Sequence, residues 1–277
     1  MELNTERLLI TVKSYPVLSS KYVELVCTAG LREDGSWVRL YPIPFRTLSQ
    51  PERYRKYDWI ECVVYKNPKD KRPESFSPQD YHNITVCGHV GTTQKWKERR
   101  ELILERATVY DDLETLIRYA KLNKTTLAVF RPSELVEFEC DATEEDWNRD
   151  RLNAAKHALQ RNDLFDDNSW RNKHELPQKI PYDFFYRFND RTGKQSKLKI
   201  LDWEIGMLYL NCLQSAQGDR NIALQKMREK YWDSFNRKDL HFFLGTTLAF
   251  QDIGTNPFTI VGVFPIPHKP VDLFDGS

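Results

Sequence analysis

The sequence lacks the paired cysteine motifs of disulfide frameworks and zinc ribbons. Its five cysteines are an odd number, widely spaced along 277 residues, and no two of them form a C-x-x-C pair. Free cysteine is among the most buried residue types. We therefore expect reduced, mostly buried thiols, no bound zinc and no cofactor.

The N-terminal part also lacks an apolar run long enough for a signal sequence or a membrane span. The run from Leu8 to Ile10 holds three residues, whereas a membrane helix needs about 20. The composition, with 40% hydrophobic, 13% aromatic and 29% charged residues, is typical of a globular protein. We expect a cytoplasmic protein with no membrane partner.

Known catalytic motifs are missing as well. The six histidines form no H-x-H or H-E-x-x-H pattern, and the chain holds no G-x-S-x-G, Walker loop or G-x-G-x-x-G. These patterns carry zinc-dependent, hydrolytic and nucleotide-dependent chemistry. Their absence does not exclude an enzyme, but it favours a protein that binds rather than catalyses.

The net charge of +1 conceals an uneven distribution along the chain. Residues 1–100 hold 17 Lys and Arg against 12 Asp and Glu, residues 101–176 hold 11 against 17, and residues 177–277 hold 13 against 11. The basic first third beside an acidic middle predicts a dipolar surface that attracts a polyanion to one side.

The chain contains many strand-like stretches interrupted by helical ones. Runs rich in β-branched and aromatic residues predict strands at 8–13, 22–32, 37–41, 59–65, 84–90, 126–130, 135–140, 182–188, 198–200, 240–245 and 258–264. Apolar spacing predicts helices at 95–106, 111–121, 143–160, 202–214 and 219–235. Large apolar side chains in the hairpin 240–264 predict that it packs within its own domain or against the N-terminal sheet.

These elements indicate an α+β fold. We expect residues 1–161 to form a small β-barrel-like domain, of OB or PUA-like type, with helical insertions. Residues 162–181 are polar and aperiodic and form the candidate linker. Residues 182–277 are expected to be an α+β domain with a helical pair and a β-hairpin, which either completes a joint sheet or forms a second barrel.

A tight turn organises the first hairpin. Asp34-Gly35 is a hairpin signal, and the strand that follows places Trp37, Arg39 and Tyr41 on one face with Val38 and Leu40 on the other. Since Val38 and Leu40 supply an apolar side, we expect the other face to be exposed and to contact a ligand.

This hairpin resembles the opening of dual-OB-containing domains, small β-barrel modules of bacterial and phage conflict systems. The resemblance is carried by Cys27-Thr28-Ala29-Gly30 and Trp37-Val38-Arg39-Leu40-Tyr41-Pro42 and covers roughly residues 8–45, with a weaker match at 242–264. It does not account for the helical insertions. It implies an OB-like barrel and nucleic-acid contact without an assigned reaction.

The favoured function is therefore nucleic-acid binding, with DNA preferred over RNA. Aromatic residues on a barrel face can stack unpaired bases while cations contact phosphates. A proline-punctuated loop at 67–74 and a basic aromatic stretch at 95–100 offer further cations. The candidate contact residues are Trp37, Arg39, Tyr41, Arg46, Lys69, Lys71, Arg72, Lys95, Trp96, Lys97, Arg99 and Arg100.

Three other functions remain open. The aromatic side chains of Trp37, Tyr41 and Trp59 could line a pocket for a modified or flipped base. The alternating acids Glu137, Glu139 and Asp141 could bind a divalent metal in a nuclease, although a solvent-exposed strand face explains them better. An adaptor could present the aromatic residues of its C-terminal helices to a partner protein: Trp203, Tyr209, Tyr231 and Trp232.

Overall fold

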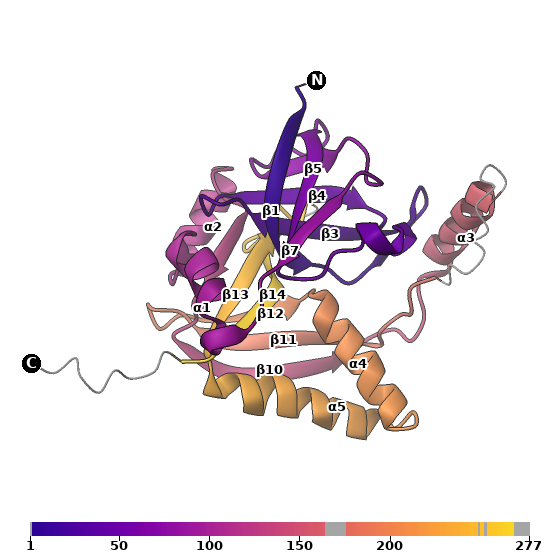
Figure 1. The fold of residues 1–277 in the computed structure, drawn as a ribbon. Coiled ribbons are helices and arrows are strands. Elements are labelled where there is room, and N and C mark those ends of the chain that lie inside the picture. The colour runs from indigo at the N-terminus through magenta and orange to yellow at the C-terminus, as the bar shows by residue number, and fades with distance from the viewer. Residues whose placement is uncertain (1, 164–175, 249, 252–253, 269–277) are drawn as a thin grey trace, which may run out of the picture.

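The structure is a computed structural model that describes residues 2–163, 176–248, 250–251 and 254–268. It confirms the α+β class: an N-terminal β-barrel packs on a second, mixed sheet that carries helices on its other side (Figure 1). Among the described residues, no helix is long and apolar enough to cross a membrane.

Five strands close the N-terminal barrel. They pair in the order β1–β3–β4–β6–β5, and β5 returns to pair with β1. All these pairs are antiparallel except β4–β6, which is parallel. The barrel strands are β1 (Asn4–Lys13), β3 (Val23–Leu31), β4 (Trp37–Ile43), β5 (Asp58–Lys66) and β6 (Ser75–Pro78), with β2 (Val17–Ser19) added on β3 and β7 (Thr85–His89) on β5.

The second sheet draws on both halves of the chain. Its strand order is β10–β11–β12–β14–β13–β9–β8, with parallel pairs at β12–β14 and β8–β9. Its strands are β8 (Val109–Tyr110), β9 (Leu127–Phe130), β10 (Glu134–Ala142), β11 (Tyr182–Asn189), β12 (Gln195–Ile200), β13 (Asp239–Thr246) and β14 (Phe258–Ile266).

Helices cover the face of this sheet that points away from the barrel. α2 (Leu113–Lys121), α4 (Trp203–Ser215) and α5 (Arg220–Arg228) bury their apolar residues there, and Figure 1 shows α4 and α5 below the sheet. α1 (Thr93–Arg100) lies near β14, and α3 (Arg149–Asp163) lies at the side of the barrel next to β2 and β3.

The other face of the sheet shares a hydrophobic core with the barrel. Leu9 and Leu31 of the barrel strands join Phe243, Val261 and Phe264 of the C-terminal hairpin in one buried cluster. A separate cluster that includes Leu8, Ile10, Val38 and Leu40 fills the barrel interior. Strands β1 and β3 are therefore covered on both sides, and the predicted burial of the C-terminal hairpin is confirmed.

Most predicted elements are found, but two details differ. Strands β2, β6 and β8 were not expected, and each is only two to four residues long. The helix expected at 143–160 begins at Arg149 instead, because the Asn148 side chain accepts the backbone N–H groups of Asp150 and Arg151. Thr143 is not its cap and accepts a hydrogen bond from Lys179.

The division of the chain follows the two sheets. Strands β10 and β11 are separated in sequence by α3 and the expected linker at 162–181, and they pair with each other in the second sheet. Most of that linker, residues 164–175, lies outside the described residues. Strands β8, β9 and β10, which precede the expected linker, lie in one sheet with β11–β14, which follow it.

Candidate nucleic-acid interface

The outer face of β4 lies against the second sheet and not against solvent. The Trp37 ring packs edge-on against Phe243 with 5.8 Å between ring centres. Arg39 is 2% exposed. The expectation of an open face on this strand is therefore wrong: Val38 and Leu40 do face the barrel interior, but the opposite face is covered by β9 and β13.

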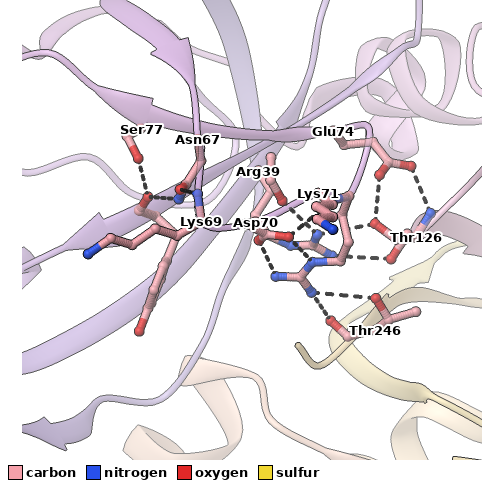
Figure 2. A network of polar contacts seen from close by, with 12 residues as sticks. Arg39, Asn67, Lys69, Asp70, Lys71, Glu74, Ser77, Thr126 and Thr246 are labelled. Atoms are coloured by element: carbon pink, nitrogen blue, oxygen red, sulfur yellow. Dashed lines mark hydrogen bonds and ion pairs between the residues drawn. The ribbon is translucent and has the colours of Figure 1, made fainter. Parts of the chain in front are cut away.

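Arg39 joins the barrel to the second sheet through hydrogen bonds (Figure 2). Its Nη1 donates to Ser75 Oγ at 3.2 Å and to Thr126 Oγ1 at 3.1 Å, and its Nη2 donates to the Thr126 carbonyl at 3.2 Å. Glu74 holds Thr126 from the other side by accepting its backbone N–H and its hydroxyl. Burial lowers the Arg39 pKa, and the guanidinium has no surface to offer to a phosphate.

Arg72 makes a second link of the same kind. Its Nε and Nη2 donate to the two carboxylate oxygens of Asp70 at 2.8 and 2.6 Å, and its Nη1 donates to the Thr246 carbonyl at 2.6 Å. Arg72 is 6% exposed, so its predicted exposure is also wrong. The Arg72 guanidinium is held by a bidentate pair with Asp70 of its own loop and also bonds to Thr246 of the second sheet. These contacts fix the loop 67–74 on the second sheet.

Lys69 and Lys71 of the same loop are exposed as expected. Figure 2 shows both in the loop that carries Asp70 and Glu74. The Lys71 carbonyl accepts a hydrogen bond from Asn123 at 2.9 Å, which brings the loop to the end of α2. Gln251 donates to the Ala120 carbonyl at 2.9 Å and brings the β13–β14 connection to the same place.

These two hydrogen bonds bring together, at the junction of the barrel and the second sheet, three segments that carry exposed cations and apolar side chains. We call this set the junction surface: exposed Lys69, Lys71, Lys121, Lys124, Leu122, Leu248 and Phe250. Phe250 is 56% exposed and Leu122 is 58% exposed. The sequence analysis identified the first two lysines and missed the others, since α2 and the hairpin loop are far from them in sequence.

The predicted basic stretch of α1 splits into an exposed and a buried part. Lys95 and Lys97 are exposed, and the Trp96 ring packs against Phe264. Arg99 is 5% exposed and stacks on Tyr57, with its guanidinium carbon 3.7 Å from the ring centre. Arg100 is engaged too, because it donates to Asp239 and to the Pro267 carbonyl.

Tyr41 and Arg46 are half-buried. The backbone carbonyl of Tyr41 accepts hydrogen bonds from Asn67 and Ser77. Arg46 pairs with buried Glu24 at 3.2 Å. Of the predicted contact residues, only the lysines at 69, 71, 95 and 97 are exposed along their side chains.

The acidic strand is neutralised by its neighbours. Lys197 pairs with Glu139 at 2.6 Å and with Asp141 at 2.9 Å, and Arg187 pairs with Glu139 at 2.7 Å. No three His, Cys, Asp or Glu side chains in the described ranges gather as metal ligands. The strand is therefore a cross-strand ion ladder, and the nuclease hypothesis has no support in its geometry.

The aromatic residues of the C-terminal helices belong mainly to the core. Tyr209 and Tyr231 are buried, and Trp232 packs on the same cluster. Trp203 faces the barrel, where its ring lies 5.5 Å from that of Phe45. These side chains do not form the exposed aromatic surface that the adaptor hypothesis needs.

An ion cluster around the buried Lys56 also joins the barrel to the second domain, and no sequence pattern indicated it. Lys56 of the barrel donates to Asp202 at 2.8 Å and to Glu204 at 3.0 Å. Asp202 caps α4, and it also accepts a hydrogen bond from the Val263 backbone and is fully buried. Although burial disfavours the charged lysine, the two carboxylates outweigh it and raise the Lys56 pKa.

The geometry thus defines a class: an α+β protein in which a five-stranded barrel and a helix-backed mixed sheet share one core. The chain belongs to the family of the domain of unknown function DUF8757, whose family model matches residues 106–276. Residues 4–105 match a second family model, the domain of unknown function DUF8758. A search of curated proteins found no match. The boundary at 105/106 coincides with the change from the barrel to the second sheet.

Proposed function

We propose that this protein binds nucleic acid through the junction surface. The observation that carries the proposal is that three segments distant in sequence, joined by the Asn123–Lys71 and Gln251–Ala120 hydrogen bonds, carry four exposed lysines and an exposed phenylalanine: Lys69, Lys71, Lys121, Lys124 and Phe250. Lysines supply the phosphate contacts that dominate affinity, and an aromatic ring supplies a stacking platform for an unpaired base.

The buried polar contacts support this proposal by holding the segments in place. Arg72 ties the lysine-bearing loop to Thr246, and Asn123 ties it to the end of α2. A surface whose backbone is fixed loses less conformational entropy on binding than a free loop would. The last turn of α2 also favours cations, since a helix C-terminus carries partial negative charge.

The resemblance of the first hairpin to dual-OB-containing domains supports the same proposal. It suggests a non-enzymatic sensor or accessory factor of a prokaryotic defence or mobile-element system, located in the cytoplasm. The preference for DNA over RNA is part of this proposal and is decided by the binding panel described next.

The proposal is tested by salt-dependent binding of labelled single-stranded DNA, duplex DNA and RNA. A variant with Lys69, Lys71, Lys121 and Lys124 changed to Gln removes four charges. If all four contact phosphates, the slope of log affinity against log salt falls in magnitude by about 3. A matched variant with Arg151, Lys156, Lys194 and Lys230 changed to Gln loses the same charge elsewhere and keeps the parent slope. Equal slopes for both folded variants would refute the proposal.

The aromatic part is tested separately. Phe250→Ala should weaken single-stranded binding by about 1–3 kcal/mol without changing the salt slope, because stacking releases no counterions. Ile222→Ala, at an apolar residue on α5 that is 45% exposed, is the control. Unchanged affinity in Phe250→Ala would show that Phe250 does not stack on a base.

A further inference from the structure

A second candidate site lies between α4 and the segments before α3 and β11. It is a pocket with a cavity volume of about 370 Å³. Its apolar wall includes Trp147 and Leu213, and its polar groups include Glu145, Lys179 and Arg220, with Tyr209 contributing to the lining. A mostly apolar wall with a few convergent polar groups is the usual composition of a ligand pocket, and the volume lies at the low end of the usual range of about 300–1,000 Å³.

The hydroxyl group of Tyr209 has no hydrogen-bond partner among the described residues, although it is fully buried. Buried polar groups are almost always paired, so an unpaired one points to a missing partner. The Tyr209 pKa is raised, mainly by burial and then by Tyr182. The charge of Arg220 lowers this pKa and that of Glu145 raises it. Tyr209 lines the pocket together with Arg220 and Glu145.

The rest of the pocket wall is fixed before any ligand binds. Trp147 Nε1 donates to the Pro177 carbonyl at 2.8 Å, which sets the orientation of the indole. Lys179 Nζ donates to Thr143 Oγ1 at 3.1 Å and to the Ile180 carbonyl at 2.7 Å. A preformed aromatic wall lowers the entropic cost of binding a flat ligand.

An exposed ion pair borders the pocket. Arg220 donates to both carboxylate oxygens of Glu145, at 2.6 and 2.7 Å. The two side chains are 48% and 60% exposed, so solvent screens the pair and it opens at little cost. Both groups can then hydrogen-bond a ligand that has donor and acceptor atoms on its edge.

From these observations we propose that this pocket binds a planar heteroaromatic ring of nucleobase type. The ring stacks on Trp147, and an acceptor atom on its edge receives the unpaired Tyr209 hydroxyl. The ring comes either from a free nucleoside or from an unstacked base of a bound strand. The first source is independent of the function proposed for the junction surface, and the second rests on it.

The test uses the full-length protein and its Tyr209→Phe variant. Calorimetric titration with adenosine, guanosine, cytidine and uridine should show saturable binding of at least one nucleoside, weakened about 3- to 10-fold by the loss of one neutral hydrogen bond. Tyr209→Phe should also unfold at the same or a higher temperature, because it removes an unsatisfied buried group. Tyr65→Phe, on the barrel, is the control and should bind as the parent does.

Two further titrations separate the sources of the ring. A single-stranded oligonucleotide and its abasic counterpart are compared in the parent and in Tyr209→Phe. If the variant weakens only the base-bearing strand, the pocket takes a base of the strand, whereas an effect on nucleosides alone assigns it to free nucleosides. If Tyr209→Phe and Trp147→Phe, both folded, bind nucleosides and strands as tightly as the parent does, the pocket proposal is overturned while the junction surface stays testable through its salt slope.

Discussion

At the scale of the residue, the sequence identifies which side chains are unusual but not which side of the protein they face. Arg39 was expected to be exposed because it alternates with the apolar residues Val38 and Leu40, and Arg72 because it lies in a proline-punctuated loop, but both are buried. The alternation of β4 correctly placed Val38 and Leu40 inside the barrel. Nothing in that alternation indicates that a second sheet covers the opposite face, because the covering residues come from β9 and β13.

Arg39 should therefore contribute to stability and not to phosphate binding. Arg39→Ala removes the buried hydrogen bonds to Ser75 Oγ, Thr126 Oγ1 and the Thr126 carbonyl and opens a cavity, so the free energy of unfolding should fall by about 2–4 kcal/mol. Arg39→Met keeps most of the volume and should cost less. Urea denaturation measures both, and Lys69→Ala, at an exposed site, serves as the control within about 0.5 kcal/mol. A folded Arg39→Ala variant with parental stability but a reduced salt slope would show that Arg39 contacts phosphates and contradict this prediction.

Lys13 gives the protein a pH dependence that can be isolated. Its Nζ lies 4.1 Å from the centre of the Phe45 ring and 4.5 Å from that of Trp203, and burial lowers its pKa to about 8. An unfolded lysine keeps its proton up to about pH 10.4. Between these values the unfolded chain binds more protons than the folded one, so stability rises with pH across this window.

The prediction for Lys13 concerns the difference in stability between the parent protein and its Lys13→Met variant. The stability of the parent relative to Lys13→Met should increase by about 2–3 kcal/mol from pH 7 to pH 10, measured by urea denaturation at each pH. Other titrating groups, Lys56 included, are present in both proteins, so the difference cancels them to first order. A difference that stays constant over this range would mean that Lys13 titrates normally in the folded protein.

At the scale of the element, the sequence predicts the long strands and the helices of the second sheet. The Asp34-Gly35 turn is confirmed, with Gly35 at φ +82°. The helix predicted at 202–214 is α4, which ends at Ser215 and is followed by Gly218 at φ +90°. What it misses are short strands such as β6, whose four residues carry no periodicity of their own. Their pairing comes from neighbouring strands, which supply the hydrogen-bond partners.

Gly206 shows how a contact between elements overrides helix propensity. Alanine is preferred over glycine inside a helix by about 1 kcal/mol. A Cβ at Gly206, however, would lie 2.3 Å from Tyr15 Cδ2 and 2.8 Å from Ile180 Cδ1. Tyr15 is also fixed by its hydroxyl, which donates to the Gln178 carbonyl at 2.8 Å.

We therefore expect Gly206→Ala to destabilise the protein by about 1–3 kcal/mol, the usual cost of overpacking. Thermal unfolding followed by circular dichroism measures the change. The control is Ser215→Ala at the exposed end of the same helix, where we expect a change within about 0.5 kcal/mol. A Gly206→Ala variant more stable than the parent would show that the Tyr15 ring moves aside at little cost.

At the scale of the whole molecule, the barrel and the second sheet behave as one structural unit. They share the buried cluster around Leu9 and Phe243, the Arg39 and Arg72 contacts, and the ion pair between Lys56 and Asp202. This is the part that the sequence could not predict, because each contact joins residues that are 80 or more positions apart. It also explains why the expected binding face was buried while the junction surface was missed.

The last prediction follows from this shared core. A fragment of residues 1–105 holds all the barrel strands but leaves one of its faces uncovered, including Leu9, Val12 and Leu31. An exposed apolar face of this kind promotes association, so the isolated fragment should aggregate or bind a hydrophobic dye strongly. Co-expression with residues 106–277 should restore a soluble one-to-one complex, detected by size-exclusion chromatography with light scattering. A fragment 1–105 that is monomeric, binds no dye and unfolds cooperatively would show that the barrel is stable without its partner sheet.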